Sequence, residues 1–151
     1  MNISTEQTLK RLRIFLLILA GLMFFGTLVE LWAVEHTREP IQKLPYVLAA
    51  AGLFVIVLAL IHPARPTLYL LQVVMGLAVI GGAFGAFIHL KINYDVAIVL
   101  GPGGNSLDLA INTLKGHNPL LAPGILAFAG ILGLASTYQR PSLPKSPSKR
   151  N

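Results

Sequence analysis

The residues that could together bind a transition-metal ion are Glu30, His36, His89 and His117. Imidazole nitrogens and carboxylate oxygens are ligands that Zn(II), Cu(II) and Fe(II) accept. No HxxxH or HxH motif places two of these histidines on one helical turn. A metal site therefore depends on how the elements that carry the four residues come together.

Two of these residues lie within or beside long apolar stretches. Glu30 is near the end of an apolar run, where an ionised carboxylate costs a few kcal/mol unless it is paired or faces water. It either reaches solvent at the membrane surface or turns inward to meet a His, a Lys or an ion. His89 continues the row Gly81, Gly85, His89, Asn93 at four-residue steps, which is one face of a helix. Its imidazole is expected to bond a backbone carbonyl or Glu30, or to act as a metal ligand.

Other chemistries find little support in the sequence. The chain has no cysteine, which excludes disulfides, thiolate catalysis and cysteine-based metal centres. A haem would need two histidines that face each other inside the fold, and it is not expected. Ser106 and His117 lack a nucleophile-elbow sequence, so we do not expect an enzyme. The glycines of residues 101–104 lack the terminal Lys-Ser/Thr of a phosphate-binding loop.

The composition defines the setting of these residues. Of the 151 residues, 54% are hydrophobic and only 12% are charged, which excludes a water-soluble globular domain. The net charge is +6, but the cations sit at the chain ends and between apolar blocks rather than in a basic stripe with interleaved aromatics. Nucleic-acid binding is therefore not expected, and the lipid bilayer is the predicted environment.

Four apolar blocks predict an all-α polytopic protein, an antiparallel bundle of four transmembrane helices. A helix needs about 20 residues to cross about 30 Å of hydrocarbon. The predicted spans are residues 14–34, 44–61, 67–90 and 119–138 within a transmembrane domain of residues 14–138. Residues 1–13 form a cytoplasmic N-terminal segment in this interpretation, and residues 139–151 form a disordered basic cytoplasmic tail. Residues 91–118 are expected to be a loop, with a short interfacial helix that Asn105 caps.

The cations predict the orientation. Four crossings put both termini on one side, and that side holds eight of the 12 Lys and Arg residues. The positive-inside rule then places both termini in the cytoplasm. In this topology Glu30, His36, His89 and His117 all lie near the outer surface.

Small residues predict which helix faces meet. Helices in lipid associate where small side chains allow their backbones to approach. The third block carries such a face, made of Gly81, Gly82, Gly85 and Ala86. We expect this face to pack against another helix.

Several short segments resemble a group of small bacterial inner-membrane proteins with four predicted helices. The segments are Val29-Glu30-Leu31-Trp32, residues 85–89 with Asn93, residues 118–124 and residues 133–138. The resemblance covers most of residues 25–140. It implies the same four-helix architecture but no particular activity.

The sequence therefore predicts a non-enzymatic inner-membrane protein with an outward-facing Glu/His cluster. This cluster is expected to bind a partner subunit or a transition-metal ion. The expected protein partners are other membrane-protein subunits or further copies of this chain. The alternative is a small oligomeric transporter or ion-coupled permease, in which Glu30 is the coupling carboxylate.

Overall fold

The computed structural model describes residues 3–33, 40–100 and 105–138, and their regular structure is entirely helical, as predicted. His36 lies outside these ranges. The elements are α1 (Ile3–Ala33), the 3-10 helix η1 (Pro40–Lys43), α2 (Leu44–Ile61), α3 (Arg65–Leu100), α4 (Ser106–Leu114) and α5 (Leu121–Ala135).

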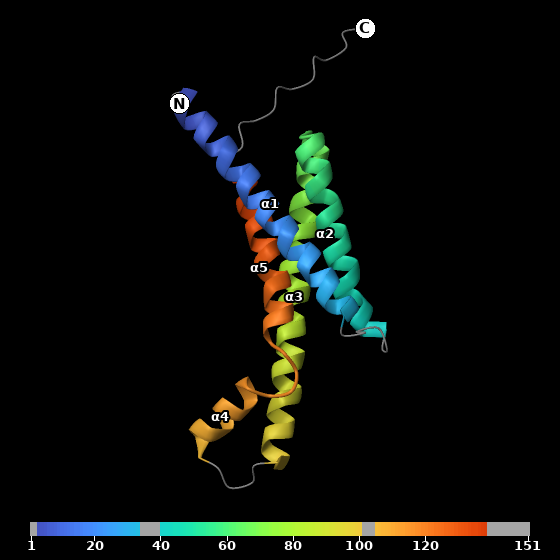
Figure 1. Cartoon of the computed structure of the whole chain (residues 1–151), viewed down its shortest axis with the longest axis vertical. Helices are drawn as coiled ribbons and strands as arrows, with labels where there is room; N and C mark the ends of the chain where they lie inside the picture. Colours follow the sequence, from blue (N-terminus) through green and yellow to red (C-terminus); the bar gives the residue numbers. More distant parts are fainter. Residues whose placement is uncertain (1–2, 34–39, 101–104, 139–151) are drawn as a thin grey trace.

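Four of the helices form a ring. Each of α2 and α5 packs against both α1 and α3, so that α1 and α3 lie diagonally opposite each other. Figure 1 shows that α3 is much longer than its neighbours and continues past the level where α1, α2 and α5 end or begin. α4 packs beside this extension of α3. We call this end of the molecule the α4 end, and the opposite end, where α1 begins, the terminus end.

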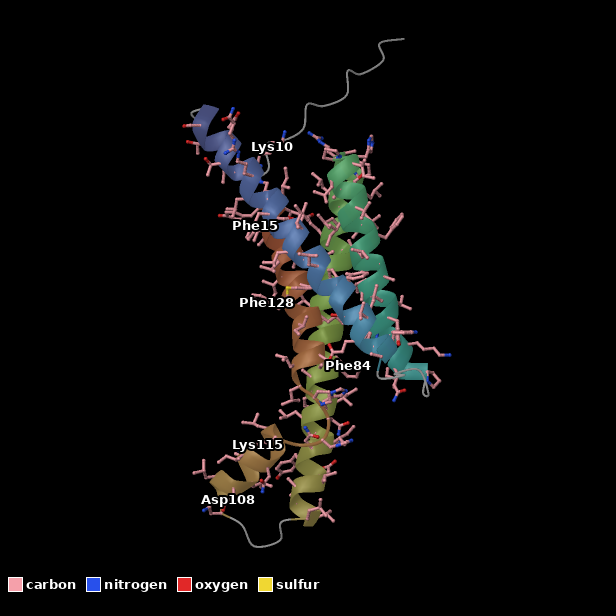
Figure 2. The ribbon with its side chains drawn as sticks, in the orientation of Figure 1. Lys10, Phe15, Phe84, Asp108, Lys115 and Phe128 are labelled. Atoms are coloured by element: carbon pink, nitrogen blue, oxygen red, sulfur yellow. The ribbon has the colours of Figure 1, made fainter. Side chains whose placement is uncertain are left out.

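The centre of the ring is apolar. Its largest fully buried side chains come from all four helices, and they include Phe24 of α1, Ile56 of α2, Met75 of α3 and Leu126 of α5. The outer surface is also apolar, and Figure 2 shows Phe15 and Phe128 on it, both more than half exposed. Helices that are apolar on every side are typical of proteins surrounded by lipid.

Within the described ranges, three helical segments are long and apolar enough to cross a membrane, namely Ser4–Ala33, Pro40–Ile61 and Arg65–Leu100. This finding supports a membrane location. The fourth predicted span, residues 119–138, contains the apolar helix α5, which has only 15 residues. At about 1.5 Å per residue α5 is about 22 Å long, which is less than the hydrocarbon thickness.

α3 differs most from the prediction. Its helix was expected to end near residue 90, but it continues to Leu100. The polar residues Lys91, Asn93 and Asp95 are compatible with a helix. The first residues that break a helix are Gly101 and Pro102. The predicted loop of residues 91–118 is therefore largely helical, formed by the end of α3 and by α4.

Polar contacts fasten α5 at the terminus end. Gln72 of α3 donates a hydrogen bond from Nε2 to Thr137 Oγ1 at 3.1 Å, and Arg13 of α1 donates from Nη2 to the carbonyl of Tyr138 at 3.3 Å. The end of α5 is thus tied to both of its neighbours, which fixes α5 antiparallel to α1 and α3.

Candidate functional site

Asn93 of α3 binds the segment that connects α4 to α5. Its side chain is only 2% exposed. Its Nδ2 donates to the carbonyl of Asn118 at 2.9 Å, and its Oδ1 accepts from the Asn118 backbone N–H at 3.0 Å and from Asn118 Nδ2 at 3.1 Å. A buried carboxamide without partners would be costly, so these bonds hold the connecting segment on α3.

His89 lies one turn earlier on α3 and holds the next residue of the same segment. Its Nδ1 is 2.8 Å from the carbonyl oxygen of Pro119. A carbonyl oxygen only accepts, so Nδ1 carries the proton in this bond. Pro123, four residues further on, has no N–H with which to bond the Pro119 carbonyl within the helix. His89 therefore satisfies an acceptor that the proline leaves without a helical donor.

Gly116 allows the connecting segment to approach α3 closely. A Cβ atom at this position would overlap the side chain of Asn93. The segment can therefore sit against the buried carboxamide only with glycine here. Asn93, Gly116 and Asn118 form one local unit at the α4 end.

A pocket of about 220 Å³ lies where all the helices of the ring meet near this unit. Residues of α1, η1, α2, α3 and the start of α5 line it, and most of them are apolar. The polar residues of the wall are Thr27, Gln42, His89 and Asn118. Thr27 donates its hydroxyl to the Met23 carbonyl at 3.0 Å, and Asn118 bonds Asn93, so these two groups have partners within the protein.

Of the predicted metal ligands, the three that the structure describes, Glu30, His89 and His117, do not come together in one group. Glu30 is exposed and does not line the pocket that His89 lines. His117 is also exposed and lines a different hollow, beside Asn93 and Asn112. Among the residues that the structure places, no three His, Asp or Glu side chains are close enough to hold a metal ion. Since His36 is outside that set, metal binding through Glu30, His36, His89 and His117 stays a prediction.

Gly81, Gly82 and Gly85 of α3 lie at close helix contacts. A Cβ at Gly82 would be 2.6 Å from the backbone nitrogen of Ala127 and 2.7 Å from the carbonyl of Pro123, both in α5. A Cβ at Gly85 would be 3.2 Å from Pro123 Cβ, and one at Gly81 would overlap the Leu48 side chain of α2. α3 thus approaches α5 and α2 on two adjacent faces. Ala86, the fourth residue of the predicted packing face, is half-buried.

α5 brings its own glycine to the same contact. A Cβ at Gly130 would be 2.7 Å from the carbonyl of Met75 on α3. Both backbones are therefore close together along the α3–α5 contact, which positions the start of α5, and with it Pro119, against His89.

A groove between α3 and α4 at the α4 end was not predicted from the sequence. The groove has a volume of about 560 Å³. Its walls are Phe87, Leu90, Lys91 and Tyr94 of α3 and Ser106, Leu109, Ala110, Thr113 and Leu114 of α4. The signal that could have revealed it is the uninterrupted stretch of residues 91–100, which contains no Gly or Pro and therefore extends the helix.

Transport would need a polar path through the bundle. The buried polar side chains in the described part of the chain are Thr27, Thr67, Asn93, Thr113 and Ser136, and none of them is charged. Ser136 donates to the Gly133 carbonyl at 2.6 Å and Thr113 donates to the Leu109 carbonyl at 2.8 Å. These hydroxyls bond their own helices and do not form a continuous path.

Comparisons with protein-family models, with curated proteins and with solved structures find no match to this chain.

Proposed function

We propose that this protein is a non-enzymatic integral membrane protein that binds a partner protein through the end of α3. The observation that supports the proposal is the length of α3, which has 36 residues and so extends about 54 Å. A bilayer is about 40–45 Å thick with its headgroups. One end of α3 must then stand outside the membrane.

The cations of α3 indicate which end that is. Lys91 follows Arg65 by 26 residues, which corresponds to about 39 Å along the helix. This separation is close to the distance between the two headgroup layers. With Arg65 at one headgroup layer and Lys91 at the other, residues 92–100 project into water.

The projecting end carries large apolar side chains on its surface. Val96, Ile98, Val99 and Leu100 are exposed, and Val99 is 75% exposed. α4 packs against α3 but leaves these four side chains uncovered. Exposed apolar patches outside the lipid mark protein interaction sites. We define the projecting patch as these four residues, and its proposed occupant is a second membrane-protein subunit or another copy of this chain.

The proposed topology places the chain in a bacterial inner membrane, with four crossings and with both termini in the cytoplasm. α5 contacts α1 and α3 along the ring and ends beside the first part of α1. α5 is partly enclosed by these neighbouring helices. The non-helical backbone at its two ends is therefore largely shielded from lipid, although α5 is shorter than the hydrocarbon is thick. Lys10, Arg11 and Arg13 lie toward the terminus end and support the cytoplasmic assignment of that end.

Site-specific photo-crosslinking in native membranes tests the proposal. A photoreactive amino acid replaces Val99 in one variant and Val57 in the control. Both valines are exposed, but Val57 is within the apolar length of α2 and is expected to face lipid. We expect Val99 to give a discrete protein adduct and Val57 to give none. An adduct at twice the chain mass identifies self-association, and a different mass identifies another subunit. Lack of any protein adduct at Val96, Ile98 and Val99 would overturn the proposal.

A further inference from the structure

We propose that the groove between α3 and α4 binds one phospholipid of the outer leaflet, with its phosphate at Lys91 and an acyl chain along Phe87 and Leu90. The inference rests on the membrane placement in the proposed function, and it adds a ligand class and a site. It concerns the face of α3 that lies toward α4, whereas the projecting patch lies further along the helix.

The α3 wall of the groove is one continuous face. Phe87, Leu90, Lys91 and Tyr94 are related by steps of three and four residues, so they share one side of the helix, and all four line the groove. Along the helix axis the order is apolar, then cationic, then phenolic. This is the order of the parts of a phospholipid, from acyl chain to phosphate to polar headgroup.

The residues of α4 form the second wall of a cleft that can hold an acyl chain. Leu109, Ala110 and Leu114 face the groove, and Ser106 lies at its other end. Figure 2 shows α4 beside the end of α3, with Asp108 near its beginning and Lys115 at its end. The hydroxyl of Thr113 is already bonded to the Leu109 carbonyl at 2.8 Å. The groove therefore offers a ligand a mainly apolar surface and one charged group, the ammonium of Lys91.

Charge identifies the occupant as a phosphate-bearing lipid. Lys91 is the only charged residue among the described residues that line the groove. The neighbouring acid on α3, Asp95, lies in a separate hollow with Val96 and Val99, and Asp108 of α4 does not line the groove. An ammonium at headgroup depth attracts the phosphodiester of a lipid, and each such Lys contributes about 1 kcal/mol to binding, which is about fivefold in affinity.

The depth of the groove in the membrane agrees with this occupant. Lys91 is about 39 Å from Arg65 along α3, which places it among the headgroups. Phe87 is one turn closer to the hydrocarbon, and Tyr94 is about one turn further out, where tyrosine is enriched in membrane proteins. A lipid can therefore enter the groove without leaving its leaflet.

Native mass spectrometry of the full chain tests the site. The protein is extracted from vesicles of phosphatidylcholine that contain one part in five of phosphatidylglycerol, and retained lipid is counted as the detergent is exchanged. Lys91→Gln removes the charge, and Ala110→Phe fills the groove from α4. Lys43→Gln is the control, because Lys43 is an exposed lysine of η1 outside the groove. We expect retention to fall about fivefold in Lys91→Gln and further in Ala110→Phe, and to be unchanged in Lys43→Gln.

Two outcomes would overturn the lipid site. In one, Lys91→Gln and Ala110→Phe retain as much lipid as the unmodified chain. In the other, glycerol phosphate without acyl chains displaces the lipid, which would make the groove a site for free phosphate. The photo-crosslinking at Val99 is read independently. Loss of lipid retention with a protein adduct still present at Val99 means that only the lipid site fails, and retained lipid without an adduct means that only the partner proposal fails.

Discussion

Asn93 on α3 and Asn118 after α4 are 25 positions apart in the chain and share three hydrogen bonds of 2.9, 3.0 and 3.1 Å. The carboxamide of Asn93 imitates a stretch of backbone, because its NH₂ donates to the Asn118 carbonyl while its oxygen accepts from the Asn118 N–H. The buried Asn93 and the half-buried Asn118 connect the α3–α4 extension to the start of α5. Both the groove and the pocket that His89 lines depend on this link.

Replacing Asn93 by leucine should destabilise the α4 end. The backbone groups of Asn118 would lose their partners, at a cost of about 1–3 kcal/mol for each group that stays buried. Asn93→Asp should also destabilise, because its carboxylate accepts from the Asn118 N–H but cannot donate to the Asn118 carbonyl, and an ionised carboxylate is costly at a buried position. Unfolding by sodium dodecyl sulfate in mixed micelles measures the change. Asn112→Leu serves as the control, since Asn112 is exposed on α4. Equal stability of Asn93→Leu and Asn112→Leu would contradict the assigned role.

The close contact between α3 and α5 makes a second prediction. Gly82→Ala places a Cβ within 3 Å of backbone atoms of α5, which cannot move aside as a flexible side chain can. We expect a loss of about 1–3 kcal/mol. Gly76→Ala is the matched control in the same helix, because a Cβ there meets nothing within 4 Å. It should be neutral or stabilising, since alanine is the better helix former. The same micelle titration compares the two, and equal effects would show that α3 and α5 do not pack as described.

The cap of α4 makes a third prediction. Asn105 Oδ1 accepts a hydrogen bond from the Asp108 backbone N–H at 2.9 Å. Asn105→Ala should destabilise α4 by about 1 kcal/mol. Because α4 has only nine residues, the loss should appear as faster hydrogen exchange of its amides while those of α2 are unchanged. Asn105→Asp should restore most of the protection, since a carboxylate also accepts this bond. Unchanged exchange in Asn105→Ala would show that the cap is not needed.

Much of the fold is readable from hydropathy and from residues that break helices. Residues 62–64 separate α2 from α3, so the predicted spans of residues 44–61 and 67–90 are two separate helices, and Asn105 caps a helix as predicted. The predicted end of α3 near residue 90 was wrong, because the helix continues through Lys91, Asn93 and Asp95 to Leu100. In the proposed placement these polar residues mark the point where α3 leaves the lipid and not the end of the helix.

The arrangement of the polar residues was harder to predict. The spacing of His89 and Asn93 indicates a shared helix face, and Pro123 indicates a carbonyl without a helical donor. The sequence does not show that these two features meet, because the meeting depends on how α5 packs against α3. Glu30 illustrates the reverse case. Its place in an apolar run suggested two interpretations, and only packing decides that the side chain is on the outer surface.

The number of membrane crossings depends on α5 and can be measured directly. The chain has no cysteine, so single cysteines can be introduced without background. Ser4→Cys and Tyr138→Cys lie at the terminus end, and Lys115→Cys lies at the C-terminal end of α4. If α5 crosses the membrane, a membrane-impermeant maleimide added to intact cells should label Lys115→Cys alone. Ser4→Cys and Tyr138→Cys should react only after permeabilisation.

The labelling pattern distinguishes three crossings from four. If α5 did not cross, Tyr138→Cys would react from outside together with Lys115→Cys, while Ser4→Cys would remain protected. That pattern would conflict with the hydrogen bond from Arg13 to the Tyr138 carbonyl, which places the end of α5 beside the first part of α1. Because α1 carries Lys10, Arg11 and Arg13 in that part, the end of α5 should share the compartment of these cations. We therefore expect protection of Tyr138→Cys to follow that of Ser4→Cys.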